Sequence, residues 1–249
     1  MNICGRTDVG LKRSQNEDSI FFSGEALGCL PNLFIIADGM GGHNAGEVAS
    51  LGSIRFFREF VVNDELTNDE HTECLDTLIS ATNYANFRVY EHSKKDSDLS
   101  GMGTTFVATS LDKDSDKLLA AHVGDGRIYI VNDECITQIT TDHTYVNEMV
   151  RTGQLTPEQA RKHPKRNILT RALGTQEQVD IDCIVHPLKA RDKILMCSDG
   201  LSTLVEDDEI LSIMQSDETL DCIAKNLIDC ANSRGGLDNI SVILIEYGI

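Results

Sequence analysis

The chain has 249 residues, of which 41% are hydrophobic and 25% charged, so its composition is that of a globular protein and excludes disordered, collagen-like and fibrous classes. It carries 40 acidic and 22 basic residues, a formal charge of −18, which argues against binding nucleic acid or an anionic membrane through the overall field. The length suits one domain over residues 1–249.

The chain gives no sign of export or membrane insertion. Its first residues lack the basic-then-apolar pattern of a signal peptide, and no apolar run approaches the length of a membrane span. The eight cysteines form no Cys-x-x-Cys pair, and most lie in apolar runs. We therefore expect a cytoplasmic protein whose cysteines, Cys197 among them, are reduced core residues.

The first half of the chain combines two strands with two helices. A short strand is predicted at 18–22, and the apolar run at 32–37 predicts a central strand. A glycine-rich turn over 38–43 follows it. Apolar residues at three- and four-residue steps then predict helices at about 45–60 and about 69–92.

The period then changes to that of short strands. Polar turns at 112–116 and 132–134 predict antiparallel neighbours. A polar, basic and irregularly helical stretch covers 142–174, and a pair of helices covers 206–233. The strands predicted in this half lie at 104–111, 117–123, 127–131, 135–139, 182–185, 193–197 and 240–247.

Strands in hairpin order with helices inserted in two blocks do not make a simple βαβ array. They predict an α+β fold, an α-β-β-α sandwich of two antiparallel sheets flanked by helices.

Several common active-site motifs are absent from the sequence. The run 41–46 has the glycine spacing of a P-loop, but Glu47 and Val48 follow instead of Lys and Ser or Thr. A cysteine-dependent phosphatase needs an arginine six residues after its cysteine, and neither Cys197 nor Cys230 has one. The chain also contains no His-Glu-x-x-His zinc motif and no Gly-x-Ser-x-Gly elbow.

Four aspartates stand at the ends of predicted strands. Asp38, Asp125 and Asp199 each follow an apolar run, whereas Asp238 precedes one. In an antiparallel sandwich, these positions can share one edge, where four carboxylates would repel each other unless a cation held them. Oxygen ligands of this kind suit Mg²⁺ or Mn²⁺ better than zinc. The alternative is that each Asp-Gly pair is ordinary turn chemistry.

Seven motifs in chain order resemble those of the metal-dependent protein phosphatases, the type 2C Ser/Thr phosphatases, in their bacterial single-domain form. The resemblance extends from Gly5 to the last predicted strand. The motifs are Arg13-Ser14-Gln15-Asn16-Glu17-Asp18, Asp38-Gly39-Met40-Gly41-Gly42-His43, Gly101-Met102-Gly103-Thr104-Thr105, Val123-Gly124-Asp125, Asp142-His143-Thr144, Cys197-Ser198-Asp199-Gly200 and Asp238-Asn239-Ile240-Ser241.

This resemblance implies two Mn²⁺ or Mg²⁺ ions in a cleft on the sandwich. By position, Asp38 bridges both ions, and Asp199 and Asp238 complete the first site. The second site takes the Gly39 carbonyl, with Asp18 or Glu17 bound directly or through water. A third, weaker metal site of bacterial members matches Asp125 together with Asp199.

The resemblance also implies the reaction. A hydroxide bridging the two ions attacks a phosphate monoester in line, Arg13 holds the phosphate, and His43 is the candidate general acid. For His43, structural support beside the site is the alternative role. The implied substrates are phosphoserine and phosphothreonine proteins, the implied partner is a cognate Ser/Thr kinase, and we expect a monomer.

Three local features have more than one interpretation. The segment 144–166 matches the family's flap, and its basic residues either recruit acidic phosphoproteins or are simply solvated. His143 precedes a predicted helix that Asp142 or Thr144 would cap. Gly126 stands where the family usually has serine, and we expect altered loop stiffness near the third metal rather than loss of catalysis.

Two other functions compete with a protein phosphatase. One is a pseudophosphatase that recognises phosphoproteins without turnover, but an inactive protein has no reason to keep carboxylates that repel one another. The other is a phosphatase of small metabolites, which no sequence feature excludes.

Overall fold

The computed structural model describes residues 1–41, 45–63 and 73–248, and within them the strands form two antiparallel sheets. The first sheet has the order β1-β11-β10-β7-β8, and the second has the order β2-β3-β5-β6-β9, with β4 paired to β3. The strands are β1 (Asn2–Asp8), β2 (Asp18–Ser23), β3 (Leu33–Met40), β4 (Gly103–Thr104), β5 (Phe106–Asp112), β6 (Lys117–Val123), β7 (Arg127–Val131), β8 (Ile136–Gln138), β9 (Asp182–Pro187), β10 (Lys193–Cys197) and β11 (Ile240–Glu246).

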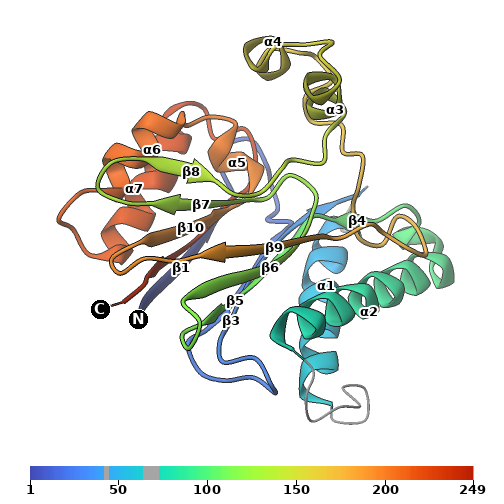
Figure 1. Ribbon diagram of the computed structural model, residues 1–249. Helices are drawn as coiled ribbons and strands as arrows, with labels where there is room; N and C mark the ends of the chain where they lie inside the picture. The colour runs from blue at the N-terminus through green and yellow to red at the C-terminus, as the bar shows by residue number, and fades with distance from the viewer. Residues whose placement is uncertain (42–44, 64–72, 249) are drawn as a thin grey trace.

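Helices cover the outer face of each sheet (Figure 1). Helices α1 (Ala45–Val62) and α2 (Cys74–Lys95) pack on the second sheet, and α6 (Asp207–Met214) and α7 (Leu220–Ser233) pack on the first. The short elements are the 3₁₀ helix η1 (Ser97–Leu99) and α5 (Asp199–Ser202). The predicted α-β-β-α sandwich is confirmed. Among the described residues, no helix has both the length and the apolar content needed to cross a bilayer.

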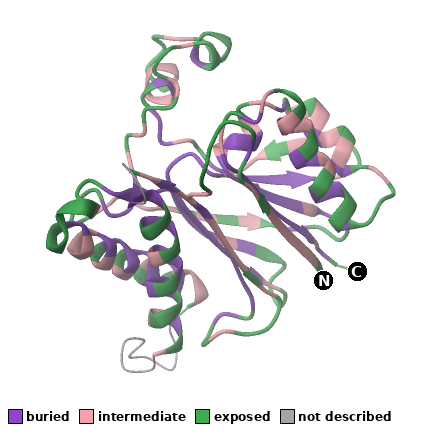
Figure 2. Cartoon of the chain, turned by 180° about the vertical axis from the view of Figure 1, so that it is seen from behind, coloured by how far each residue is buried: buried purple, intermediate pink, exposed green. Residues whose placement is uncertain are grey.

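The side-chain alternation of β3 shows how the layers form. Phe34 and Ile36 belong to the apolar cluster between the two sheets, whereas Leu33, Ile35 and Ala37 belong to the cluster under α1 and α2. All five residues are buried. A strand that is apolar on both faces must lie between two apolar layers, which is why the run 32–37 reads as central. Figure 2 shows the same layering as buried strands inside partly exposed helices.

The flap projects from the body and carries α3 (Tyr145–Arg151) and α4 (Pro157–Arg161) (Figure 1). The Thr144 side chain caps α3 by accepting a hydrogen bond from the Asn147 amide at 3.2 Å. Of the two candidate caps, Thr144 is therefore the right one. Asp142 instead forms an ion pair with Arg127 at 2.7 Å.

Four predictions about elements and burial need correction. Strand β1 was not predicted, because its mixed sequence gains its hydrogen bonds only by pairing with β11. Strand β3 continues to Met40, so Asp38 and Gly39 lie in a strand rather than in a turn. The described part of α2 begins at Cys74, and residues 69–72 lie outside the described residues. All eight cysteines are free; Cys197 is buried and Cys4, Cys74 and Cys230 are half-buried against the core, whereas the other four are exposed, so their assignment to the core was wrong.

The connection 124–126 carries the chain from β6 in one sheet to β7 in the other. Gly124 makes this crossing with a φ of 108°, which favours glycine. Glycine is favoured at position 126 for a different reason. A Cβ there would lie 2.9 Å from Val107 Cγ2, so a serine would require Val107 to move. The crossing places Asp125 where the two sheets meet.

Candidate metal and phosphate site

The predicted aspartates meet at the edge where the two sheets come together. Asp18 and Asp38 are opposite each other in the register of β2 and β3. Asp199 begins α5 two residues after the end of β10, Asp238 stands two residues before β11, and Asp125 lies in the crossing between the sheets. Each of Asp18, Asp38, Asp125 and Asp199 is close enough to another aspartate of the set for repulsion to affect its pKa.

Burial and mutual repulsion raise the pKa values of these carboxyls. Burial raises the pKa of Asp18 to about 7 and that of Asp199 to about 6, and neighbouring aspartates add to both shifts. The pKa values of Asp38 and Asp125 lie well above the ordinary value for the same two reasons, with Asp199 among the repelling neighbours of each. The protein alone therefore supplies too little positive charge for this edge, and divalent cations would relieve the repulsion.

Asp18 is held between the two sheets by hydroxyl groups of β11 and of the residue that follows β10. Its Oδ2 atom accepts hydrogen bonds from Ser198 Oγ at 2.8 Å and Ser241 Oγ at 2.6 Å. Its Oδ1 atom is buried and has no hydrogen-bond partner among the described residues. An orphaned carboxylate oxygen beside three further carboxylates is a ligand for a hard cation, so the donor set fits Mg²⁺ or Mn²⁺.

The backbone of Asp38 is fixed from β4 and the residue after it. Thr104 Oγ1 and the Thr105 amide both donate to the Asp38 carbonyl at 2.8 Å, and the Asp38 amide donates to Thr105 Oγ1 at 3.1 Å. Gly39 is required next to it, because a Cβ there would lie 2.1 Å from the Gly46 carbonyl oxygen at the start of α1. The threonine pair thus positions the predicted bridging ligand, a role that the sequence motif did not reveal.

Asn239 ties the N-terminal loop to the same edge. Its Nδ2 atom donates to the carbonyls of Val9 and Gln15, each at 2.9 Å. Its Oδ1 atom accepts from the Glu17 amide at 2.8 Å. Three hydrogen bonds from one amide side chain explain why asparagine follows Asp238 in the motif. They also fix the loop that carries Arg13.

Arg13 lies on the rim of the carboxylate cluster. Its Nη2 atom donates to Asp238 Oδ2 at 2.8 Å, and its side chain is 49% exposed. A guanidinium with one donor on a carboxylate and the rest facing solvent can still bind phosphate oxygens. Glu17 lies nearby. Burial is the main cause of its raised pKa, and the positive charge of Arg13 acts against this rise. His43, the candidate general acid, lies outside the described residues.

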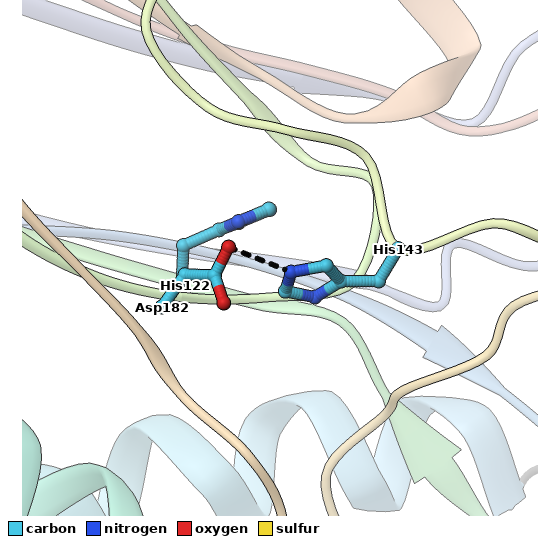
Figure 3. Close-up of side chains that lie close together, drawn as sticks. All are labelled: His122, His143 and Asp182. Carbon is cyan, nitrogen blue, oxygen red and sulfur yellow. Dashed lines mark ion pairs between the residues drawn. The ribbon is translucent and has the colours of Figure 1, made fainter. Parts of the chain in front are cut away.

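His143 connects the base of the flap to the crossing between the sheets (Figure 3). Its Nδ1 atom accepts a hydrogen bond from the Gly124 amide at 3.0 Å. Its Nε2 atom lies 3.1 Å from Asp182 Oδ2, and Arg171 donates to the other oxygen of Asp182 at 2.7 Å. The predictions assigned no role to Asp182, which only the pairing of β9 with β6 brings to this place.

The cluster of His122, His143 and Asp182 has the residue types of a metal site, but the contacts of His143 give it a structural role. Because Gly124 donates to Nδ1 of His143, the ring hydrogen is on Nε2 and points to Asp182. Both nitrogens of His143 are thus committed to the protein. The His122 ring lies against the His143 ring with their centres 4.7 Å apart, and burial lowers its pKa to about 4. The cluster instead anchors the flap.

Several basic residues of the flap have local partners. Arg161 forms an ion pair with Glu206, Arg151 pairs with Glu148, and Lys165 lies over the Tyr145 ring. This pairing reduces the free positive charge of the flap.

We predict that His143→Ala loosens the flap base. The change leaves the buried Gly124 amide without its acceptor, which costs about 1–3 kcal/mol, so amide exchange at Gly124 and Thr170 should be roughly 5- to 160-fold faster. Hydrogen exchange measured by NMR tests this. The control is His186→Ala on β9. Exchange no faster than in that control would contradict the anchoring role.

Comparison with known proteins supports one family. The family model described as "Protein phosphatase 2C" matches residues 12–234. A putative protein phosphatase 2C-type of Streptococcus pyogenes is 40% identical over 246 residues, covering 99% of this chain and 97% of that protein. The serine/threonine phosphatase stp of Listeria monocytogenes is 39% identical, with coverage of 97% and 94%.

A solved structure agrees with these sequence matches. It is the catalytic domain of the serine threonine protein phosphatase PstP in complex with two manganese ions, at 34% identity and a TM-score of 0.83, covering 98% of this chain and 96% of that one. The family model spans most of the chain, and the relatives match it nearly end to end. The chain therefore belongs to the protein phosphatase 2C family of hydrolases.

Proposed function

We propose that this protein is a metal-dependent Ser/Thr phosphoprotein phosphatase. The observation that carries the proposal is the gathering of buried carboxylates with raised pKa values beside an exposed arginine. Such a site attracts divalent cations and, with them, a phosphate dianion. Family membership and the relatives named as serine/threonine phosphatases support the same reaction.

The residues that would hold the ions are those at the meeting edge of the sheets. Asp38 would contact both ions, Asp199 and Asp238 would complete one site, and the Gly39 carbonyl would serve the other with Asp18 or Glu17. Asp125 with Asp199 would hold a third, weaker ion. When bound, Mn²⁺ or Mg²⁺ neutralises the phosphate and lowers the pKa of the attacking water.

The chain's own groups position the substrate. The planar fork of Arg13 matches two oxygens of a phosphate group, so it would orient the phosphorus toward the carboxylate cluster. Ser198 and Ser241 hold Asp18 in place by their hydrogen bonds to its Oδ2 atom. His43 would give a proton to the departing serine or threonine alkoxide. We also propose a cognate Ser/Thr kinase as the opposing enzyme in the cytoplasm.

The first test is release of phosphate from a phosphothreonine peptide. We expect Mn²⁺-dependent release that a chelator abolishes. Asp38→Asn should lower kcat by orders of magnitude, because it removes a charge from the centre of the cluster. The matched control is Asp133→Asn in an exposed turn. Near-normal turnover by Asp38→Asn would contradict its role, and activity on sugar phosphates alone would favour a metabolite phosphatase.

Arg13→Ala should mainly raise KM. The guanidinium would contact the phosphate before the transition state, and a hydrogen bond to a charged group contributes about 1.5–3 kcal/mol, so we expect a rise of roughly tenfold or more. Steady-state kinetics with the phosphothreonine peptide measures this. An unchanged KM would remove Arg13 from phosphate binding.

Metal should also stabilise the fold. An ion that binds only the folded chain stabilises it by about 2.7 kcal/mol at a hundred times its Kd. We expect the Tm to rise with millimolar Mn²⁺ and to rise less in Asp38→Asn. Differential scanning calorimetry provides the measurement. A Tm independent of Mn²⁺ in the unmodified protein would mean that the carboxylate cluster binds no metal.

A further inference from the structure

We propose that an apolar patch beside Arg13 binds an apolar side chain next to the phosphorylated residue of the substrate protein. The patch, called here the rim patch, consists of Val9, Leu11 and Leu237. This inference rests on the proposed function and adds a preference for the sequence around the phosphorylated residue.

The rim patch consists of exposed large apolar side chains on two loops that backbone hydrogen bonds hold together. Leu11 is 65% exposed, Leu237 48% and Val9 37%. A single exposed leucine is common on protein surfaces, whereas neighbouring apolar groups from two separate loops point to a binding surface. The two loops, 9–13 and 235–238, come from opposite ends of the chain.

Backbone hydrogen bonds hold the two loops together. The amides of Leu11 and Lys12 both donate to the Gly236 carbonyl, at 2.8 and 3.1 Å. The Asn239 Nδ2 atom donates a hydrogen bond to the Val9 carbonyl oxygen at 2.9 Å. Gly10 is required here, because its φ is 76° and a Cβ would lie 2.2 Å from the Asp238 carbonyl oxygen. The patch is thus built in advance, so that a ligand need not order these loops.

The rim patch is continuous with the phosphate end of the site. Leu11 stands two residues before Arg13, and Leu237 directly precedes Asp238, the carboxylate that Arg13 contacts at 2.8 Å. An extended peptide advances about 3.3–3.6 Å per residue. With its phosphate on Arg13, a substrate would place a side chain one to three positions away over the patch.

Charge favours an apolar occupant over an acidic one. The rim adjoins the carboxylates Asp238 and Glu17, and the whole protein has a formal charge of −18. An acidic neighbour of the phosphorylated residue would be repelled, and the leucines could offer it no hydrogen bond. An apolar side chain instead removes its own surface and that of the patch from water.

The test compares phosphothreonine peptides that differ only in the residues flanking the phosphothreonine: leucine, serine, glutamate or lysine. For the unmodified protein with Mn²⁺, we expect a KM for the leucine peptide about five- to tenfold below that for the serine peptide. Leu11→Ser and Leu237→Ser should each reduce this preference, whereas Leu11→Met should keep it. Hydrolysis of p-nitrophenyl phosphate, which has no flanking residues, should stay unchanged in all three variants.

The matched control is Val62→Ser, at the far end of α1 and 55% exposed, which should leave the preference intact. Equal KM values for the leucine and serine peptides would overturn the proposal. A leucine preference that survives in both serine variants would also overturn it. So would a stronger preference for the lysine peptide that survives in both serine variants, because recognition would then depend on overall charge. Failure of the proposed function would look different, because no phosphothreonine peptide would then be hydrolysed, whatever its flanking residues.

Discussion

Repulsion between buried carboxylates is the constraint on which the candidate site depends. Asp18, Asp38, Asp125 and Asp199 lie where the two sheets meet, and the first two face each other across paired strands. Water cannot screen these charges well, because the groups are buried. Either the carboxyls keep protons, as their raised pKa values indicate, or positive charge joins them. The fold thus holds a site that favours divalent cations.

The sandwich makes this arrangement rigid by fixing acidic groups from one sheet with polar groups from the other. Ser241 of β11 and Ser198, which directly follows β10, hold Asp18 of the second sheet. Asn239 ties the loop of Arg13 to the start of β11. Gathering like charges costs free energy, and the packing of the sandwich, with an apolar layer between its sheets, offsets that cost.

Much of the fold, and the gathering of the aspartates at one edge, could be predicted from the sequence. The apolar run before Asp38 and the hairpin turns predict the layers, and ordered motifs indicate the acidic residues. The roles of Thr104 and Asp182 could not be predicted, because each depends on a contact between segments far apart in the chain. Strand β1 was missed for the same reason, since only its pairing with β11 defines it.

The most direct measurement is anomalous diffraction from crystals of the protein grown with manganese. Two strong anomalous peaks are expected, with Asp38 in contact with both and with Asp199 and Asp238 around one of them. Crystals that show ordered carboxylates at this edge and no anomalous peak among them would contradict the central claim that these groups gather to bind divalent cations.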